Sequence, residues 1–281
     1  MRAVVLDSAG RPGLSEVAEP VGDGELVRVL ACGLCGSDVE KLGPEHAGAV
    51  LGHEVVAETA AGRRVALLHH APCGECARCR AGHESTCERF GVPTIVPGGF
   101  AERALATDWV ELPESLDAAR GTAAEPLACV LRGAELVPPG RVLLVGHGFV
   151  GHLFEAVLEA RGDDVFAVDS NPARRGRSPD GPVDAAVVCA PGGAAEALDA
   201  LEPGGTLLLF ADGGPLPAAP IYRRELAVVG RRSATPRHLR EAVRLLPQLE
   251  LPAPTILPLE RFHEGLALHR GGEALKVVFT P

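Results

Sequence analysis

The sequence predicts an α/β chain in which a β-rich part is followed by a doubly wound parallel sheet. Residues 1 to about 126 contain short β-like runs broken by Gly and Pro, which is typical of a β-rich domain. From about residue 139, short apolar strands alternate with helical segments. That alternation indicates a parallel sheet covered on both faces.

The β-rich part can be followed in order along the chain. Residues 1–7 are interpreted as the first strand, and 25–30 and 55–58 are further β-like runs. After the parallel sheet, the tail from about residue 232 returns to mixed character and ends in a strand over 275–279.

The second part contains five apolar runs that predict strands, at 141–145, 165–168, 185–188, 206–210 and 226–229, with a helix over 150–159. Only the interval 171–183 lies between the second and third of these strands. It includes Pro172, Pro179 and Pro182, with Gly176 and Gly181, and so favours a loop over a helix and strand. We therefore expect five parallel strands, with the second strand at an edge that the loop 172–182 shields.

Composition and charge exclude several classes of protein. The chain has 281 residues, 46% of them hydrophobic and 23% charged, which suggests two structural units of ordinary globular composition. The net charge of −10 argues against non-specific nucleic-acid binding. No apolar run approaches the roughly 18 residues of a membrane helix, and the apolar N-terminal stretch is too short for a signal peptide. We expect a cytoplasmic protein without membrane partners.

Four cysteines with the spacing C-x2-C-x2-C-x7-C predict a structural zinc site. They are Cys73, Cys76, Cys79 and Cys87. A closed set of four thiolates satisfies tetrahedral zinc and leaves no position for chemistry. An iron–sulfur cluster is the alternative, but the ferredoxin run has a shorter last gap and a Pro after its last Cys, where Glu88 stands here.

A second group of residue types is suited to a catalytic zinc ion. Cys35, His53, Glu54 and Glu125 are all good zinc ligands. Three protein ligands leave an open position in which zinc lowers the pKa of a bound alcohol. Each residue alone is more often structural, and it is their occurrence with the next motif that favours a catalytic site.

The segment Gly146-His-Gly148-Phe149-Val150-Gly151 has the dinucleotide-binding pattern. It follows a predicted strand, opens a predicted helix and is followed by Asp169 at the end of the next strand. The glycines let backbone approach a pyrophosphate, which the helix N-terminus favours. Asp169 would bind ribose hydroxyls and repel a 2′-phosphate, so NAD is favoured over NADP, although Arg174 and Arg175 lie nearby.

These motifs, in this order, resemble the zinc-containing medium-chain dehydrogenase/reductase family. Glu125-Pro-Leu127 is most similar to the sorbitol, threonine and polyol dehydrogenase branch, and 98–102 matches a further signature. The resemblance implies a GroES-like catalytic domain of residues 1–126 and 232–281, with its zinc lobe at 73–87. It implies a Rossmann domain of residues 127–231 that binds NAD. It also implies two zinc ions per chain and a homodimer or homotetramer paired through the strand 225–229.

The resemblance also assigns roles to single residues. Cys35 and His53 match catalytic zinc ligands, and Glu54 and Glu125 match two acids that alternate as ligand or near-ligand. Ser37 matches the hydroxyl that takes the substrate proton, and Asp38 matches the acid that orients the ligand histidine. The cofactor residues are Gly146, Gly148, Phe149, Val150, Gly151 and Asp169, with Arg174 near the ribose and Lys276 on the pyrophosphate.

The implied activity is hydride transfer between a secondary alcohol or polyol and NAD(H). A primary alcohol dehydrogenase or aldehyde reductase, and a non-catalytic regulatory relative, remain alternatives. The sequence departs from the family at Glu40, where a histidine often ends the proton relay, so that His46 or bulk water would take the proton. Cys32 and the pair His69 and His70 are interpreted as non-ligands.

Overall fold

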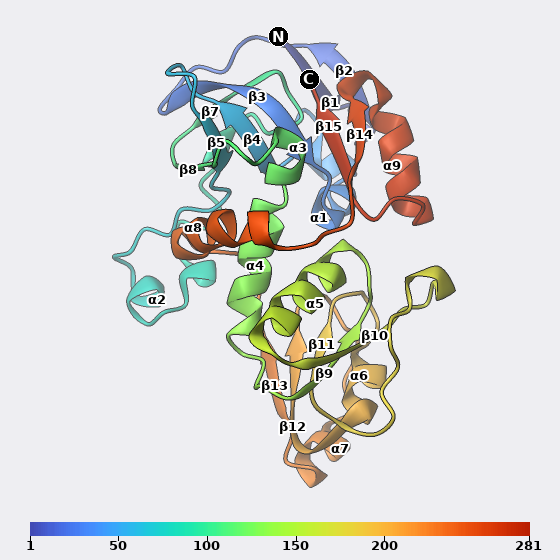
Figure 1. Cartoon of the computed structure of the whole chain (residues 1–281). Helices are drawn as coiled ribbons and strands as arrows, with labels where there is room; N and C mark the ends of the chain where they lie inside the picture. Colours follow the sequence, from blue (N-terminus) through green and yellow to red (C-terminus); the bar gives the residue numbers. More distant parts are fainter. The chain divides into compact units, whose positions relative to one another are not determined.

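The computed structural model describes residues 1–281, and its internal contacts divide the chain into two units (Figure 1). The β unit comprises Met1–Ala128, Ala234–Gln248 and Pro252–Pro281. The α/β unit comprises Cys129–Ser233 and Leu249–Leu251. The two main junctions lie two residues beyond the expected ones. None of the helices has the length and apolar character needed to cross a bilayer.

The β unit is built on a largely antiparallel sheet, as the short β-like runs predict. Its strands are β1 (Arg2–Leu6), β2 (Pro12–Glu16), β3 (Glu25–Gly33), β4 (Glu54–Glu58), β5 (Arg64–Leu67), β6 (Ile95–Val96), β7 (Arg103–Ala106), β8 (Trp109–Glu111), β14 (Thr255–Pro258) and β15 (Val277–Thr280). The order β14-β15-β3-β4-β5-β8 forms the main path, with β7 on β3 and β6 on β7. Only β14 and β15 are parallel neighbours on this path.

Aromatic packing fixes the C-terminal segment to this sheet. The rings of Phe100, Phe262 and Phe279 lie 4.6 to 5.6 Å apart between centroids, and all three are buried. Such offset and edge-on pairs stabilise a core beyond the area they bury. The helices of the β unit are α1 (Gly36–Glu40), α2 (Ala77–Arg80), α3 (Ala118–Gly121), α8 (Pro236–Leu245) and α9 (Phe262–Gly271).

Helix α4 (Ala124–Ala134) carries the chain into the α/β unit, where the five predicted strands form one parallel sheet. They are β9 (Arg141–Val145), β10 (Asp164–Val168), β11 (Val183–Val188), β12 (Leu201–Leu209) and β13 (Ala227–Gly230), in the order β10-β9-β11-β12-β13. The helices are α5 (Phe149–Arg161), α6 (Ala194–Ala200) and α7 (Ala218–Arg223). The predicted fold class and strand number are confirmed.

Strand β10 lies at one edge of the parallel sheet, as expected from the missing βα unit. The following loop covers this edge with two backbone hydrogen bonds, Ala167 N to Arg177 O at 3.0 Å and Gly176 N to Ala167 O at 3.2 Å. The Arg177 guanidinium lies 4.2 Å from the centre of the Phe166 ring. The Pro-rich loop therefore caps backbone groups that would otherwise face solvent, without forming a strand.

Candidate functional site

Cys35, His53 and Glu54 come together at the adjoining ends of two antiparallel strands. Gly33, the last residue of β3, pairs with Glu54, the first residue of β4. Cys35 follows β3 closely and His53 directly precedes β4, so the register itself brings the three residues together. Their ligand atoms all lie within 4.8 Å of one another. Sulfur, imidazole nitrogen and carboxylate oxygen form a donor set that fits zinc and leaves room for an exogenous ligand.

Asp38 orients this cluster through hydrogen bonds to His53 and to nearby backbone amides. It is 2% exposed, and its Oδ1 lies 3.2 Å from His53 Nδ1 and accepts from the Gly52 amide at 3.2 Å. Its Oδ2 accepts from the Cys35 amide at 3.1 Å. Burial by itself would raise the pKa of Asp38, but His53 and the two amides lower it overall. The ionised carboxylate therefore orients His53 so that Nε2 remains available to a metal.

Replacing Asp38 with Asn is expected to weaken metal binding at Cys35, His53 and Glu54 by about 10- to 100-fold, since the oriented imidazole loses its anionic partner. Competition with a coloured chelator measures this affinity. The matched control is Glu40→Gln, which removes an exposed carboxylate from the same helix, α1. Equal affinity in the Asn variant and the wild type would contradict the orienting role.

Glu54 is held by a buried lysine. Lys276 is 5% exposed and Glu54 is 1% exposed; the Lys276 ammonium donates to Glu54 Oε2 and to the Leu34 carbonyl, the latter at 3.1 Å. Burial would lower the pKa of Lys276, but the negative charges of Glu54 and Cys35 raise it overall. A Cβ on Gly33 would lie 2.0 Å from Glu54 Oε2, so the pair needs a glycine here. The resemblance assigns Lys276 to the pyrophosphate, and in the structure its ammonium binds Glu54.

The two remaining residues of the predicted catalytic set lie close to this cluster. The Ser37 hydroxyl donates to Cys35 Sγ at 3.4 Å. Glu125 is in the first turn of α4, and its charge helps to raise the pKa of His53 against the lowering effect of burial. Glu125 is not among the three ligands that lie within 4.8 Å of one another.

A column of aromatic rings beside the cluster was not predicted. His69 stacks on His53 with 4.5 Å between ring centroids, His70 lies 3.9 Å from His69, and Phe90 lies 3.8 Å from His70. Burial, followed by nearby positive charge, lowers the pKa of His69 to about 2, so its ring is neutral. The β4–β5 register pairs Val56 with Ala66, and its extension sets His69 opposite His53. Only strand register, which motif spacing does not reveal, could have shown this.

Cys73, Cys76, Cys79 and Cys87 form the predicted structural zinc site. Three of the Sγ–Sγ separations in the group are 3.6, 3.9 and 4.0 Å. Four thiolates ~2.3 Å from one zinc ion lie about 3.8 Å apart in a tetrahedron. Backbone amides donate to these sulfur atoms at 3.3 to 3.4 Å and lower the pKa of Cys76 to about 6, which favours the thiolate. None of the eight cysteines forms a disulfide bond.

The glycine turn of the α/β unit has the geometry that the dinucleotide motif predicts. Gly146 has a φ of +98°, and a Cβ there would lie 2.5 Å from Ala190 Cβ. A Cβ on Gly151 would lie 2.4 Å from the Gly146 carbonyl oxygen, so this glycine permits the close packing of helix and turn. Gly148 is the N-cap of α5, and Phe149 and Val150 begin the helix.

Asp169 directly follows β10 and faces this turn. Its Oδ2 accepts from the His147 amide at 2.7 Å and its Oδ1 from the Asn171 amide at 2.8 Å. Arg174, in the 3-10 helix Pro172–Arg174, places a guanidinium nitrogen 3.9 Å from the position of a Cβ on Gly148. The turn therefore combines helix N-terminal amides with the Asp169 carboxylate and the Arg174 guanidinium. This set of groups fits the ribose and phosphates of a dinucleotide.

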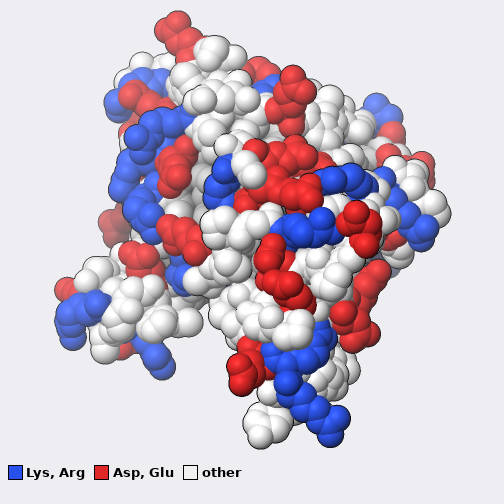
Figure 2. Space-filling model, turned by 60° about the horizontal axis from the view of Figure 1, so that its bottom comes forward, with Lys and Arg blue, Asp and Glu red and all other residues white.

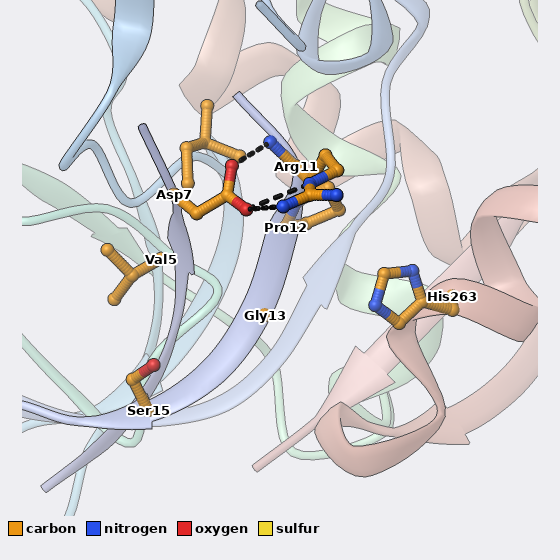
Figure 3. Close-up of a pocket in the computed structure, with 8 residues that line it drawn as sticks. Val5, Asp7, Arg11, Pro12, Gly13, Ser15 and His263 are labelled. Atoms are coloured by element: carbon orange, nitrogen blue, oxygen red, sulfur yellow. Dashed lines mark hydrogen bonds and ion pairs between the residues drawn. The ribbon is translucent and has the colours of Figure 1, made fainter. Parts of the chain in front are cut away.

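A separate hollow lies on the hairpin of β1 and β2 beside His263. Its volume is about 370 Å³, and none of the predicted site residues lines it. Figure 3 shows Asp7 and Arg11 bound to each other, with His263 apart from them. The carboxylate of Asp7 and the guanidinium of Arg11 in this hollow therefore satisfy one another.

The charged surface is mixed. On the face shown in Figure 2, acidic and basic side chains are interspersed. Such a face lacks the uniform positive potential that a nucleic-acid interface requires.

Comparisons with known proteins agree with this architecture. Residues 22–114 match the alcohol dehydrogenase GroES-like domain. D-altritol 5-dehydrogenase of Agrobacterium fabrum is 31% identical in an alignment of 300 positions that covers 88% of both chains. L-galactonate-5-dehydrogenase of Escherichia coli is 30% identical over 174 residues, 55% of this chain and about half, 51%, of that enzyme.

Among solved structures, the alcohol dehydrogenase TADH from Thermus sp. ATN1 superposes with a TM-score of 0.82 at 27% identity, covering 100% of this chain and 99% of that one. Because the similarity to D-altritol 5-dehydrogenase extends over 88% of both chains, the resemblance inferred from the motifs is confirmed. The chain belongs to the zinc-containing medium-chain dehydrogenase/reductase family of NAD(P)-dependent alcohol and polyol dehydrogenases.

Proposed function

We propose that this chain transfers a hydride between a secondary alcohol of a polyol, or the matching ketone, and NAD(H). The observation that carries the proposal is the Cys35, His53 and Glu54 donor set, oriented by Asp38. These residues would hold a catalytic zinc ion, and Glu125 would be the acid that alternates with Glu54 as a ligand or near-ligand of the ion. Zinc bound there would supply a Lewis acid that favours the alkoxide of the substrate.

The chain's own residues then perform the remaining tasks. Asp38 holds the His53 ring in one tautomer and orientation. Lys276 compensates the negative charge of Glu54, which would otherwise be costly to bury. The Ser37 hydroxyl, 3.4 Å from Cys35 Sγ, would receive the substrate proton, and His46 or bulk water would take it onward. In the α/β unit, the glycine turn and Asp169 bind NAD.

The polyol assignment draws support from the relatives, since D-altritol 5-dehydrogenase and L-galactonate-5-dehydrogenase are both named for polyhydroxylated substrates. The decisive experiment is a panel of polyols, simple secondary alcohols and primary alcohols, each assayed with NAD and NADP. Highest kcat/KM for polyols with NAD supports the proposal. Highest kcat/KM for primary alcohols would favour a primary alcohol dehydrogenase instead. NADH binding without turnover of any substrate would identify a non-catalytic relative.

Replacing Asp169 with Asn is expected to raise the NADP-to-NAD ratio of kcat/KM by at least about tenfold, or ~1.4 kcal/mol. The amide keeps a hydrogen-bond acceptor but removes the charge that repels a 2′-phosphate. Asp169→Ala, which removes both, should lose additional NAD efficiency. Initial rates with both cofactors measure the ratio. Equal use of NAD and NADP by the wild type would contradict the assignment.

We also propose a homodimer or homotetramer that pairs through residues 225–229. Strand β13 is an edge of the parallel sheet, on the opposite side from β10. An edge with apolar Val228 and Val229 needs protection from non-specific pairing. Light scattering at micromolar concentration should give the mass of two or four chains. Val228→Lys should shift it toward one chain, and a monomeric wild type would reject this assembly.

A further inference from the structure

The glycine turn and helix α5 assemble a third group of metal-ligating side chains, His147, His152 and Glu155. Their ligand atoms all lie within 4.8 Å of one another. His147 occupies the turn itself, while His152 and Glu155 are three residues apart and therefore on one face of α5. None of the three belongs to the two zinc sites described above.

The hydrogen bonds of His147 determine what its second nitrogen faces. Nδ1 lies 2.6 Å from the Arg174 carbonyl oxygen, which can only accept, so Nδ1 carries a proton. Nε2 lies 3.0 Å from Glu155 Oε2, and an ionised carboxylate also only accepts. A cation must therefore lie between the ring and the carboxylate, either as a proton on Nε2 or as a metal ion.

A second imidazole points at the same oxygen atom. His152 Nδ1 lies 3.3 Å from Glu155 Oε2, and the two imidazole centroids are 4.0 Å apart. Without a metal ion, Glu155 Oε2 would accept from an N–H of each ring, and His147 would carry protons on both of its nitrogens, whereas one metal ion would satisfy both facing nitrogens and the carboxylate. Ligands ~2.0–2.2 Å from one ion lie about 2.9 to 3.5 Å apart, depending on the coordination geometry. The measured 3.0 and 3.3 Å fall in that range.

We propose that His147, His152 and Glu155 form a third divalent-metal site, selective for zinc or another imidazole-binding transition ion. The side chains of His147, His152 and Glu155 are 6%, 23% and 29% exposed, so the ion can enter from solvent and keep water ligands. Glu155 and Asp169 supply negative charge that offsets the positive end of α5.

The site would clamp the dinucleotide-binding turn. His147 is bonded through its ring to the Arg174 carbonyl and through its amide to Asp169. A metal ion that joins His147 to α5 would therefore fix the turn, the helix and the loop that carries Arg174 as one body. This role is structural, and it does not depend on the proposed substrate or on turnover.

The test is calorimetric titration of the purified protein with Ni²⁺ and with Zn²⁺, after its tightly held metal has been counted. We expect the wild type to bind one equivalent of metal ion in addition to the metal already counted. His152→Gln and Glu155→Gln should weaken it by more than about 100-fold, because each removes a ligand. The matched control is Glu159→Gln, which removes an exposed carboxylate one turn further along α5 and should bind as the wild type does.

Two further measurements separate this site from the others. Cys35→Ser should keep the additional equivalent even if it loses the catalytic ion. In ¹⁵N spectra, Zn²⁺ should shift the Nε2 signal of His147 and leave Nδ1 protonated. The proposal would be overturned if the wild type bound no additional equivalent of metal. It would also be overturned if both α5 variants still bound that equivalent, or if Cys35→Ser no longer bound it.

Discussion

His53→Ala and Cys35→Ser are each expected to lower kcat/KM by about a thousandfold or more, while the affinity for NADH stays within about threefold. The physical reason is that a zinc ion supplies several kcal/mol of charge stabilisation to the reacting alcohol, and each 1.36 kcal/mol corresponds to tenfold in rate. We expect NADH to bind mainly through the glycine turn, which is in the other unit of the chain. Steady-state rates measure kcat/KM, NADH fluorescence measures the affinity, and the zinc content of each variant shows whether the ion has been lost.

The control for this prediction is Cys32→Ala. Cys32 forms a C-x-x-C pair with Cys35 in sequence, but it is 1% exposed within β3, and burial raises the pKa of its thiol well above the usual value. A buried neutral thiol packs as a small apolar group and is a poor ligand. Near wild-type zinc content in this variant is therefore expected. A comparable loss of zinc in Cys32→Ala, or wild-type rates in His53→Ala, would show that the catalytic ligands are misassigned.

The features predicted well from sequence are those that depend on neighbours along the chain. The four cysteines of the zinc lobe lie within 15 residues of one another, so their spacing alone restricts how they can meet. The turn at 146–151 likewise combines a strand, glycines and a helix in one short segment. The edge position of β10 followed from a loop too short and too rich in Pro for another βα unit.

The features that were missed depend on register between distant segments. Lys276 reaches Glu54 because β15 pairs with the end of β3, with Val278 opposite Gly33. The contact joins residues 222 positions apart. The stacking of His69 on His53 depends in the same way on the β4–β5 register. A shift of one residue would turn either side chain to the other face of the sheet, and composition does not specify which register is formed.

Two of the three residues of the proposed metal site in α5 have a spacing that is visible in the sequence. His152 and Glu155 stand three residues apart on a predicted helix, which places them on one face. His147 lies outside that helix, in the glycine turn, so its approach to the pair depends on the fold of the turn and not on helical spacing. The dinucleotide motif thus accounts for the glycines and leaves the residues between them free to serve another purpose.

Loss of a structural zinc ligand is expected to have the largest effect on local stability. In Cys76→Ser, the amides of residues 73–90 should lose hydrogen-exchange protection by at least about a thousandfold, while those of β4 remain protected. The lobe has almost no apolar core: from Cys73 to Phe90, only Cys87 is buried. Structural zinc contributes ~10–16 kcal/mol in small zinc-dependent domains, so the ion supplies most of what orders such a segment.

The melting temperature of the whole chain should fall less than this local effect suggests, because the lobe can open without exposing the core around Phe100, Phe262 and Phe279. The matched control is Glu75→Ala, which alters an exposed side chain between two ligands and should keep its zinc. Retained protection in Cys76→Ser would show that protein contacts alone order the lobe.

Because Phe90 lies at the end of the ring column that reaches His53, we also expect Cys76→Ser to lower kcat. Phe90→Ala should reproduce that loss of kcat without releasing zinc from the lobe.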